Sequence, residues 1–349
     1  MADTTGRRYE PHPQALAALH GDVENFARGQ GEVLHGTAGS VLTRSNRDGF
    51  RYFTHQYYDA DGRKVERYLA GPAGDAAAEA KAQALRDKIG AVKSALAHVR
   101  LLVRQGYKFV DSKTFATLAA LRNHGLFEAG ALLVGSHAYG VLLNHLGVRA
   151  AQYTTTDVDI ARGAQLALSS TPDDGFLGML GSSGIRFAAV PALNRKAPST
   201  SFKEIGKSLF QVDLLVPSAT DEVHAARVPE LKAHATALPY LRYLLAEPLE
   251  AAVLAREGCC TVRLPAPERF ALHKMIVSQL RRASGKSVKD VSQAAVLVAA
   301  LAEMHPVALE EAAKAIPRSA KRHVRNAVPM VRSELGAAHP RANDFLATL

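Results

Sequence analysis

Apolar residues recur at helical spacing over the first third of the chain. Residues 13–30 predict a short helix, and from about Asp75 the apolar positions alternate four and three residues apart, which is typical of one stripe on a long helix. That stripe comprises Leu85, Ile89, Val92, Leu96, Val99 and Val103. Gly106 closes this helix, and Asp111 can cap a further helix that runs to about Asn123.

A pattern of period two separates the first two helices. Tyr, Phe and Thr are dense in residues 40–70, and Asp61-Gly62 interrupts them with the chemistry of a tight turn. Gly71-Pro72 ends the unit. The pattern predicts a small antiparallel sheet of two or three strands.

The middle third alternates between strand and helix. Residues 131–136, 155–162 and 209–217 predict strands, and the first of them leads directly into a helix. Between the last two strands lies a segment rich in Gly, Ser and Pro, in which we expect one strand near Ile185–Val190 and two mobile loops. Strand, helix and strand in this order indicate an α/β unit.

The last third is predicted to be mostly helical from about Asp221, apart from a hairpin around Gly258. A helix that begins at Pro267 should bury an apolar stripe. The stripe comprises Leu272, Met275, Ile276 and Leu280. A second helix repeats the pattern, and the tail after it is helical with a dense basic face.

These elements predict an α+β fold in which a small mixed sheet forms the core. We expect an amino-terminal helix and small sheet in residues 1–72, a helical connector in 73–127, the core in 128–220 and a mainly helical part in 221–349.

Composition and charge narrow the class of protein. The chain has 349 residues, too many for a small stapled scaffold, and no apolar run is long enough to span a membrane. The first residues lack the apolar core of a signal peptide, and the adjacent Cys259 and Cys260 suit neither an ordinary disulfide nor a zinc site, so we expect a cytoplasmic protein. A formal net charge of +10 favours a polyanionic partner, either nucleic acid or nucleotide phosphates.

Candidate chemistry concentrates in the middle third. Asp157 and Asp159 stand two apart on a predicted strand and therefore share one face, where a divalent cation would relieve their repulsion. Asp213, on a later apolar strand, can complete a cluster of three carboxylates, and such oxygen ligands favour Mg²⁺ or Mn²⁺ over zinc. Gly135-Ser136 ends a strand and opens a helix, where free N–H groups favour a phosphate.

These stretches resemble the nucleotidyltransferase superfamily that includes DNA polymerase beta. The matching motifs are LLVGS (132–136), DVDIA (157–161) and QVDLLV (211–216), and the likeness covers roughly residues 128–217 and, more loosely, the two helices after Pro267. One departure is an apparent insertion at residues 147–156, before the Asp-x-Asp strand.

The resemblance implies a role for each motif residue. Gly135 and Ser136 would hold the nucleotide phosphates, Asp157 and Asp159 would bind both metal ions, and Asp213 would bind the catalytic metal and help to activate the acceptor. The predicted cofactor is Mg²⁺ or Mn²⁺, with a nucleoside triphosphate such as ATP as substrate.

Further cations are candidate phosphate contacts. By resemblance, Lys274 would reach the triphosphate from its helix, although its spacing with Ser278 and Arg281 equally fits an ordinary solvated face. Arg195 and Lys203, in the segment rich in Ser and Thr, could also bind nucleotide. Lys196, Lys286 and Lys289 are similar candidates for phosphate or acceptor contact.

We therefore expect a metal-dependent nucleotidyltransferase that moves a nucleoside monophosphate to an acceptor hydroxyl on RNA (including transfer RNA), protein or a small molecule. The alternative is a nucleotide-sensing, nucleic-acid-binding protein with a non-catalytic transferase core. The amino-terminal sheet, in which Arg44, Arg47 and Arg51 interleave with aromatic residues, could contact RNA or DNA, or could simply pack its aromatics on the long helix. The basic tail with Arg318, Lys321, Arg322 and Arg325 leaves the same choice open.

Overall fold

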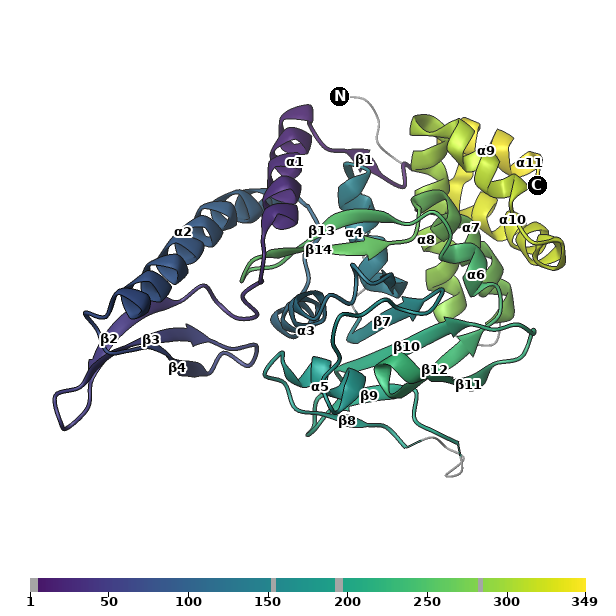
Figure 1. Ribbon diagram of the computed structural model, residues 1–349. Coiled ribbons are helices and arrows are strands. Elements are labelled where there is room, and N and C mark those ends of the chain that lie inside the picture. Colours follow the sequence, from purple (N-terminus) through teal and green to yellow (C-terminus); the bar gives the residue numbers. More distant parts are fainter. Residues whose placement is uncertain (1–5, 152–154, 192–196, 282–284) are drawn as a thin grey trace.

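The computed structural model describes residues 6–151, 155–191, 197–281 and 285–349. Its centre is a mixed β-sheet, with the carboxy-terminal helices gathered at one side and a small sheet projecting at the other (Figure 1). No helix in these described ranges is long and apolar enough to cross a membrane.

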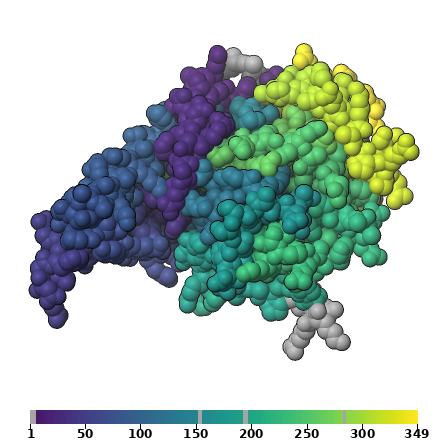
Figure 2. Space-filling model, viewed as in Figure 1, coloured from purple at the N-terminus to yellow at the C-terminus, as the bar shows by residue number. Residues whose placement is uncertain are grey.

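The amino-terminal part consists of two helices and the projecting sheet. These are α1 (Gln14–Gly29), β2 (Ser40–Ser45), β3 (Arg51–Tyr58), β4 (Lys64–Ala70) and α2 (Ala76–Arg104). The three strands are antiparallel in the order β2-β3-β4, as the sequence predicts. We call this sheet, residues 40–70, the sheet arm; it stands out from the body in Figure 2.

The long helix α2 joins the sheet arm to the body. The Asp75 side chain accepts a hydrogen bond from the Ala78 N–H and so caps the helix, because the first N–H groups of a helix lack partners within it. Phe53 of the sheet arm packs on the first turns of α2, beside Ala82. Further along, Val99 and Leu102 pack against the body, so one apolar stripe serves both contacts.

The central sheet carries the middle third of the chain. Its strands are β5 (Ala131–Val134), β7 (Asp157–Arg162), β8 (Phe187–Ala189), β9 (Ser201–Glu204), β10 (Gln211–Pro217), β11 (His224–Val228) and β12 (Ala233–Leu238). The main order is β11-β12-β10-β7-β5, in which β10 runs parallel to both β7 and β12, and β9 pairs with β10 and β8.

Two expectations about this region are wrong in part. The Gly-rich segment contains α5 (Gly175–Gly181) and β9 in addition to the expected strand. Residues 224–238 contain no α-helix but form β11 and β12, joined by a short 3₁₀ turn. Their alanines favour helix by propensity, yet Ala233, Ala235 and Ala237 are buried alternately, and this period of two decides in favour of a strand.

Four further strands form two pairs outside the central sheet and the sheet arm. The remaining strands are β1 (Glu10–Pro11), β6 (Val148–Arg149), β13 (Leu249–Leu254) and β14 (Cys259–Leu264). The hairpin β13-β14 is the predicted one. The strand β6 lies within the apparent insertion and pairs with β1.

The remaining helices all lie after α2, in the middle and last parts of the chain. They are α3 (Ser112–Asn123), α4 (Gly135–His145), α6 (Leu241–Leu244), α7 (Pro267–Leu280), α8 (Lys286–Met304), α9 (Pro306–Lys314), α10 (Lys321–Leu335) and α11 (Pro340–Ala347). Short 3₁₀ turns lie at Pro229–Leu231, Arg318–Ala320 and Gly336–Ala338. In α7, Leu272, Met275 and Ile276 are buried as predicted, whereas Leu280 is 44% exposed because the helix ends there.

Candidate functional site

A row of register partners crosses the central sheet at the predicted acids. Asp159 of β7 lies opposite Val134 of β5 on one side and opposite Asp213 of β10 on the other. Because register partners point to the same face of a sheet, the two carboxylates share one face, and Asp157, two residues before Asp159, joins them there.

The turn after β5 is shaped around Asp159. Gly135 has φ +70°, and a Cβ atom at this position would lie 1.9 Å from Oδ2 of Asp159. Only glycine accepts both this backbone conformation and this approach. Gly135 also begins α4, so Ser136 and the free N–H groups of the first turn open beside the carboxylate, in an arrangement that favours an anion.

The electrostatics of Asp159 follow from this crowding. Burial, reinforced by the negative charges of Asp213 and Asp157, raises the pKa of Asp159 to about 7, against the opposing influence of Lys274 and Arg281. A cation between the acids would remove this conflict. As they stand, however, no three His, Cys, Asp or Glu side chains within the described ranges form a group that could hold a metal ion, and Asp213 accepts a hydrogen bond from Gln211 at 2.7 Å.

Lys274 faces this site and not the solvent. Its Nζ atom lies 2.7 Å from Oδ1 of Asp290 on α8 and 5.3 Å from the centre of the Phe270 ring. The side chains of Lys274 and Asp290 are only 12% and 4% exposed. The interpretation of Lys274 as part of an ordinary solvated helix face is therefore wrong.

One cavity of about 300 Å³ brings most of the predicted residues together. Predicted residues on its wall are Gly135, Ser136, Asp157, Asp159, Asp213, Lys274, Lys286 and Lys289. Lys203 does not line it: this residue lies on β9 opposite Gln211, two residues along the strands from the pair of Asp213 and Ser201. Arg195 and Lys196 lie outside the described residues.

The wall also contains residues that sequence reasoning missed. Asp290 is one, since only the packing of α7 on α8 brings it to Lys274. His273 is another: burial lowers its pKa to about 3, helped by Lys274 and Arg281, and its Nε2 atom has no hydrogen-bond partner among the described residues. His137, predicted to pack at the start of α4, is indeed buried, and its pKa falls to about 4, mainly through burial. Both rings are therefore neutral at physiological pH.

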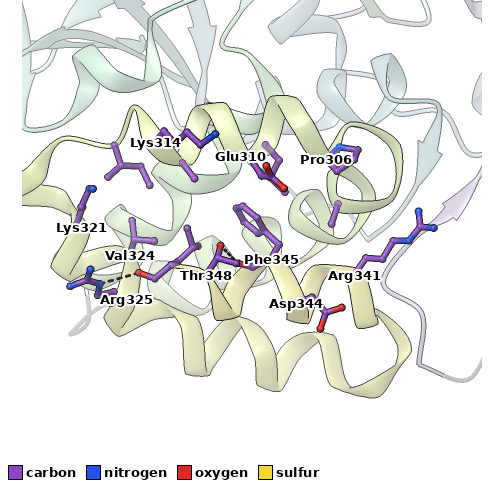
Figure 3. Close-up of a pocket in the computed structure, with 15 residues that line it drawn as sticks. Pro306, Glu310, Lys314, Lys321, Val324, Arg325, Arg341, Asp344, Phe345 and Thr348 are labelled. Atoms are coloured by element: carbon purple, nitrogen blue, oxygen red, sulfur yellow. Dashed lines mark hydrogen bonds between the residues drawn. The ribbon is translucent and has the colours of Figure 1, made fainter.

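A larger cavity, of about 770 Å³, lies elsewhere in the fold. Residues of α9, α10 and α11 line it, with Phe345 near its middle and Arg325 donating to the Leu349 carbonyl oxygen at 3.0 Å (Figure 3). No residue of the acidic site reaches it.

Comparison with known proteins places the chain in a class. Residues 112–317, more than half of the chain, match the family model described as "Nucleotidyltransferase". The chain therefore belongs to the nucleotidyltransferase family, as its motifs predict, and the coarse function that the family supports is nucleotidyl transfer.

A solved structure and the curated proteins add little to this. The chain is similar to a structure titled as an antigenic nucleotidyltransferase-like protein from Paracoccidioides brasiliensis, with 15% identity over 67% of this chain and 91% of that chain. The TM-score is 0.33, and we draw nothing from so low a value. No curated protein matches the chain.

Proposed function

We propose that the chain transfers a nucleoside monophosphate from a nucleoside triphosphate to an acceptor hydroxyl, in the cavity between the central sheet and α7. The observation that carries this proposal is the row in which Asp159 and Asp213 stand side by side, with Gly135-Ser136 opening α4 directly beside Asp159. Acids and a helix start at one cavity are the parts that nucleotidyl transfer needs.

Asp157, Asp159 and Asp213 fit a divalent cation by their chemistry. All three are hard oxygen donors on one face, and the pKa of Asp159 is raised by burial first and by the neighbouring negative charges of Asp213 and Asp157 second, which a cation would offset. We propose that they hold Mg²⁺ or Mn²⁺. When bound, such ions lower the pKa of the attacking hydroxyl and neutralise the departing pyrophosphate.

The remaining residues would bind and orient the triphosphate. Ser136 and the N–H groups at the start of α4 would donate hydrogen bonds to phosphate oxygens. Lys274 would exchange its contact with Asp290 for a phosphate. Lys203 and Arg195 remain proposed nucleotide contacts, Lys203 from the adjoining strand β9.

The acceptor and the cell compartment are inferred from the net charge and the cysteines. The net charge of +10 supports a polyanionic acceptor such as RNA, while protein and small-molecule acceptors stay open. We also propose a cytoplasmic location, because both Cys259 and Cys260 are buried free thiols, which suits a reducing compartment.

The test uses α-³²P-labelled nucleoside triphosphates, each incubated with purified protein, Mg²⁺ and separate fractions of cellular RNA, protein and metabolites. Transfer of label to one fraction identifies the acceptor. Asp159→Asn should remove transfer and leave the fold intact, whereas Asp221→Asn, at an exposed loop position, should match wild type. Equal transfer by Asp159→Asn would overturn the proposal.

The same experiment separates the alternative function. Triphosphate binding that needs Mg²⁺ but releases no pyrophosphate with any fraction would favour a nucleotide-sensing protein with a non-catalytic core.

A further inference from the structure

The sheet arm buries only one of its two faces. Phe53 and Ala70, on the face toward α2, are 3% and 6% exposed. On the other face, Phe50 and Tyr68 are 42% and 64% exposed. Large aromatic side chains that are exposed together are typical of a surface that binds a partner.

The exposed rings of Phe50 and Tyr68 are joined into a row by Tyr52, which is half-buried between them. The Phe50 and Tyr52 rings are stacked with centroids 6.2 Å apart, and the Tyr52 and Tyr68 centroids are 5.8 Å apart. We call Phe50, Tyr52 and Tyr68 the aromatic row. It lies near the turn between β2 and β3, at the outer end of the sheet arm. Its rings provide flat apolar surfaces next to one another.

Positive charge flanks the aromatic row. Arg47 lies within that turn and Arg51 directly after it, and both are exposed. Neither forms an ion pair with any of the described residues. The negative charge of the nearby Glu66 is already balanced by Arg44, which binds it at 2.7 Å. Thr54 and Gln56 also donate hydrogen bonds to Glu66, and with the Arg44 contact they lower its pKa to about 2.

We propose that the aromatic row binds single-stranded nucleic acid, with unpaired bases stacked on Phe50, Tyr52 and Tyr68 and phosphates contacted by Arg47 and Arg51. Every base has a flat face that can stack on an aromatic ring, and neighbouring arginines supply the charge that the backbone requires. Bases in a duplex are already stacked on each other and offer no such face.

This surface is separate from the cavity at Asp159, so the inference goes beyond the proposed function. The opposite end of the sheet arm is held to the body: Lys113 Nζ lies 3.0 Å from Asp61 Oδ1 and 2.6 Å from Glu204 Oε1. A nucleic-acid strand bound by the aromatic row would therefore be held by a sheet arm that is itself fixed to the body with the cavity.

The test is fluorescence anisotropy of labelled 20-nucleotide RNA and DNA with the full chain. EDTA is present and triphosphate absent, so failure of the proposed transfer reaction cannot affect the result. We expect binding to single strands, weakened roughly 5- to 150-fold by Tyr68→Ser or Tyr52→Ser. Tyr58→Ser is the matched control, since Tyr58 is 51% exposed at the other end of β3. Competition between RNA and DNA strands identifies the preferred sugar.

Salt and oligomer measurements complete the test. Arg47→Ala and Arg51→Ala should each reduce the slope of log affinity against log salt by about 1, with the circular dichroism spectrum unchanged. Equal affinity of wild type and the Tyr68→Ser variant, or tighter binding to duplex than to single strands, would overturn the inference. So would absence of binding together with a dimer that Tyr68→Ser dissociates, because the row would then be a contact between copies of the chain.

Discussion

The carboxylate of Asp159 fills the space that any side chain at position 135 would need. A Cβ atom at Gly135 would lie 1.9 Å from Asp159 Oδ2, in a backbone conformation with φ +70°. The start of α4, which we propose binds phosphate, is thus in direct contact with Asp159, which we propose binds metal. Any side chain added at position 135 must displace Asp159.

Gly135→Ala should therefore abolish nucleotide binding and destabilise the fold. The left-handed conformation alone costs a non-glycine residue about 1 to 2 kcal/mol, and the clash with Asp159 adds to this. Gly90→Ala is the control, because Gly90 lies inside α2 with nothing within 4 Å of its added Cβ, and it should stabilise by about 0.5 to 1 kcal/mol. Urea denaturation and triphosphate titration measure both effects. Unchanged binding in Gly135→Ala would contradict the proposed phosphate site.

The ion pair of Lys274 with Asp290 should behave as a buried pair. Lys274→Met leaves the Asp290 carboxylate, 4% exposed, without its cation, so the loss of unfolding free energy should be about 3 to 5 kcal/mol. Adding Asp290→Asn to that variant should restore part of the stability but not triphosphate affinity, since the phosphate contact comes from the lysine. Lys88→Met is the control: its partner Glu32 is 73% exposed, and the loss should stay below about 1 kcal/mol. Equal losses of unfolding free energy in Lys274→Met and Lys88→Met would contradict the description of Lys274 and Asp290 as a buried ion pair.

Acid should destabilise the protein through His273 and His137. Burial lowers both folded-state pKa values, to about 3 and about 4, whereas histidine in the unfolded chain titrates at its ordinary pKa of 6.5. Above pH 6.5 neither state binds the proton. As pH falls below 6.5, only the unfolded state takes it up, so stability decreases by about 1.4 kcal/mol per pH unit for each histidine until its folded pKa is reached.

The measurement for this prediction is the unfolding free energy between pH 7.5 and pH 5. His273→Gln should flatten the slope by one proton, and the exposed His98→Gln on α2 should keep the wild-type slope. A His273→Gln slope equal to that of wild type would mean that the buried ring does not remain neutral.

The acids and the glycine were predictable because their geometry is local. Asp157 and Asp159 share a face by strand periodicity alone, and Gly135 stands between strand and helix signals in the sequence. Asp290 was not predictable as the partner of Lys274, since sixteen residues and a helix junction separate them. The strands β11 and β12 were not predicted because alanine favours a helix by local propensity. Here pairing of β12 with β10 and with β11 makes the segment a strand, and this pairing is not visible in the local sequence.

Lys113 should attach the sheet arm to the body through two ion pairs. It contacts Asp61 of the arm turn at 3.0 Å and Glu204 of β9, whose side chain is only 11% exposed, at 2.6 Å. Lys113→Met should therefore release the turn, and hydrogen exchange of residues 59–64 should become faster while exchange in β10 stays unchanged. Arg63→Met is the matched control, because Arg63 also contacts Asp61, at 3.3 Å, but is 78% exposed and forms no ion pair with the body in the part of the chain that the structure describes. If Arg63→Met accelerated exchange as much as Lys113→Met, the turn would be held by its own charges, and the sheet arm would have no ionic attachment through Lys113.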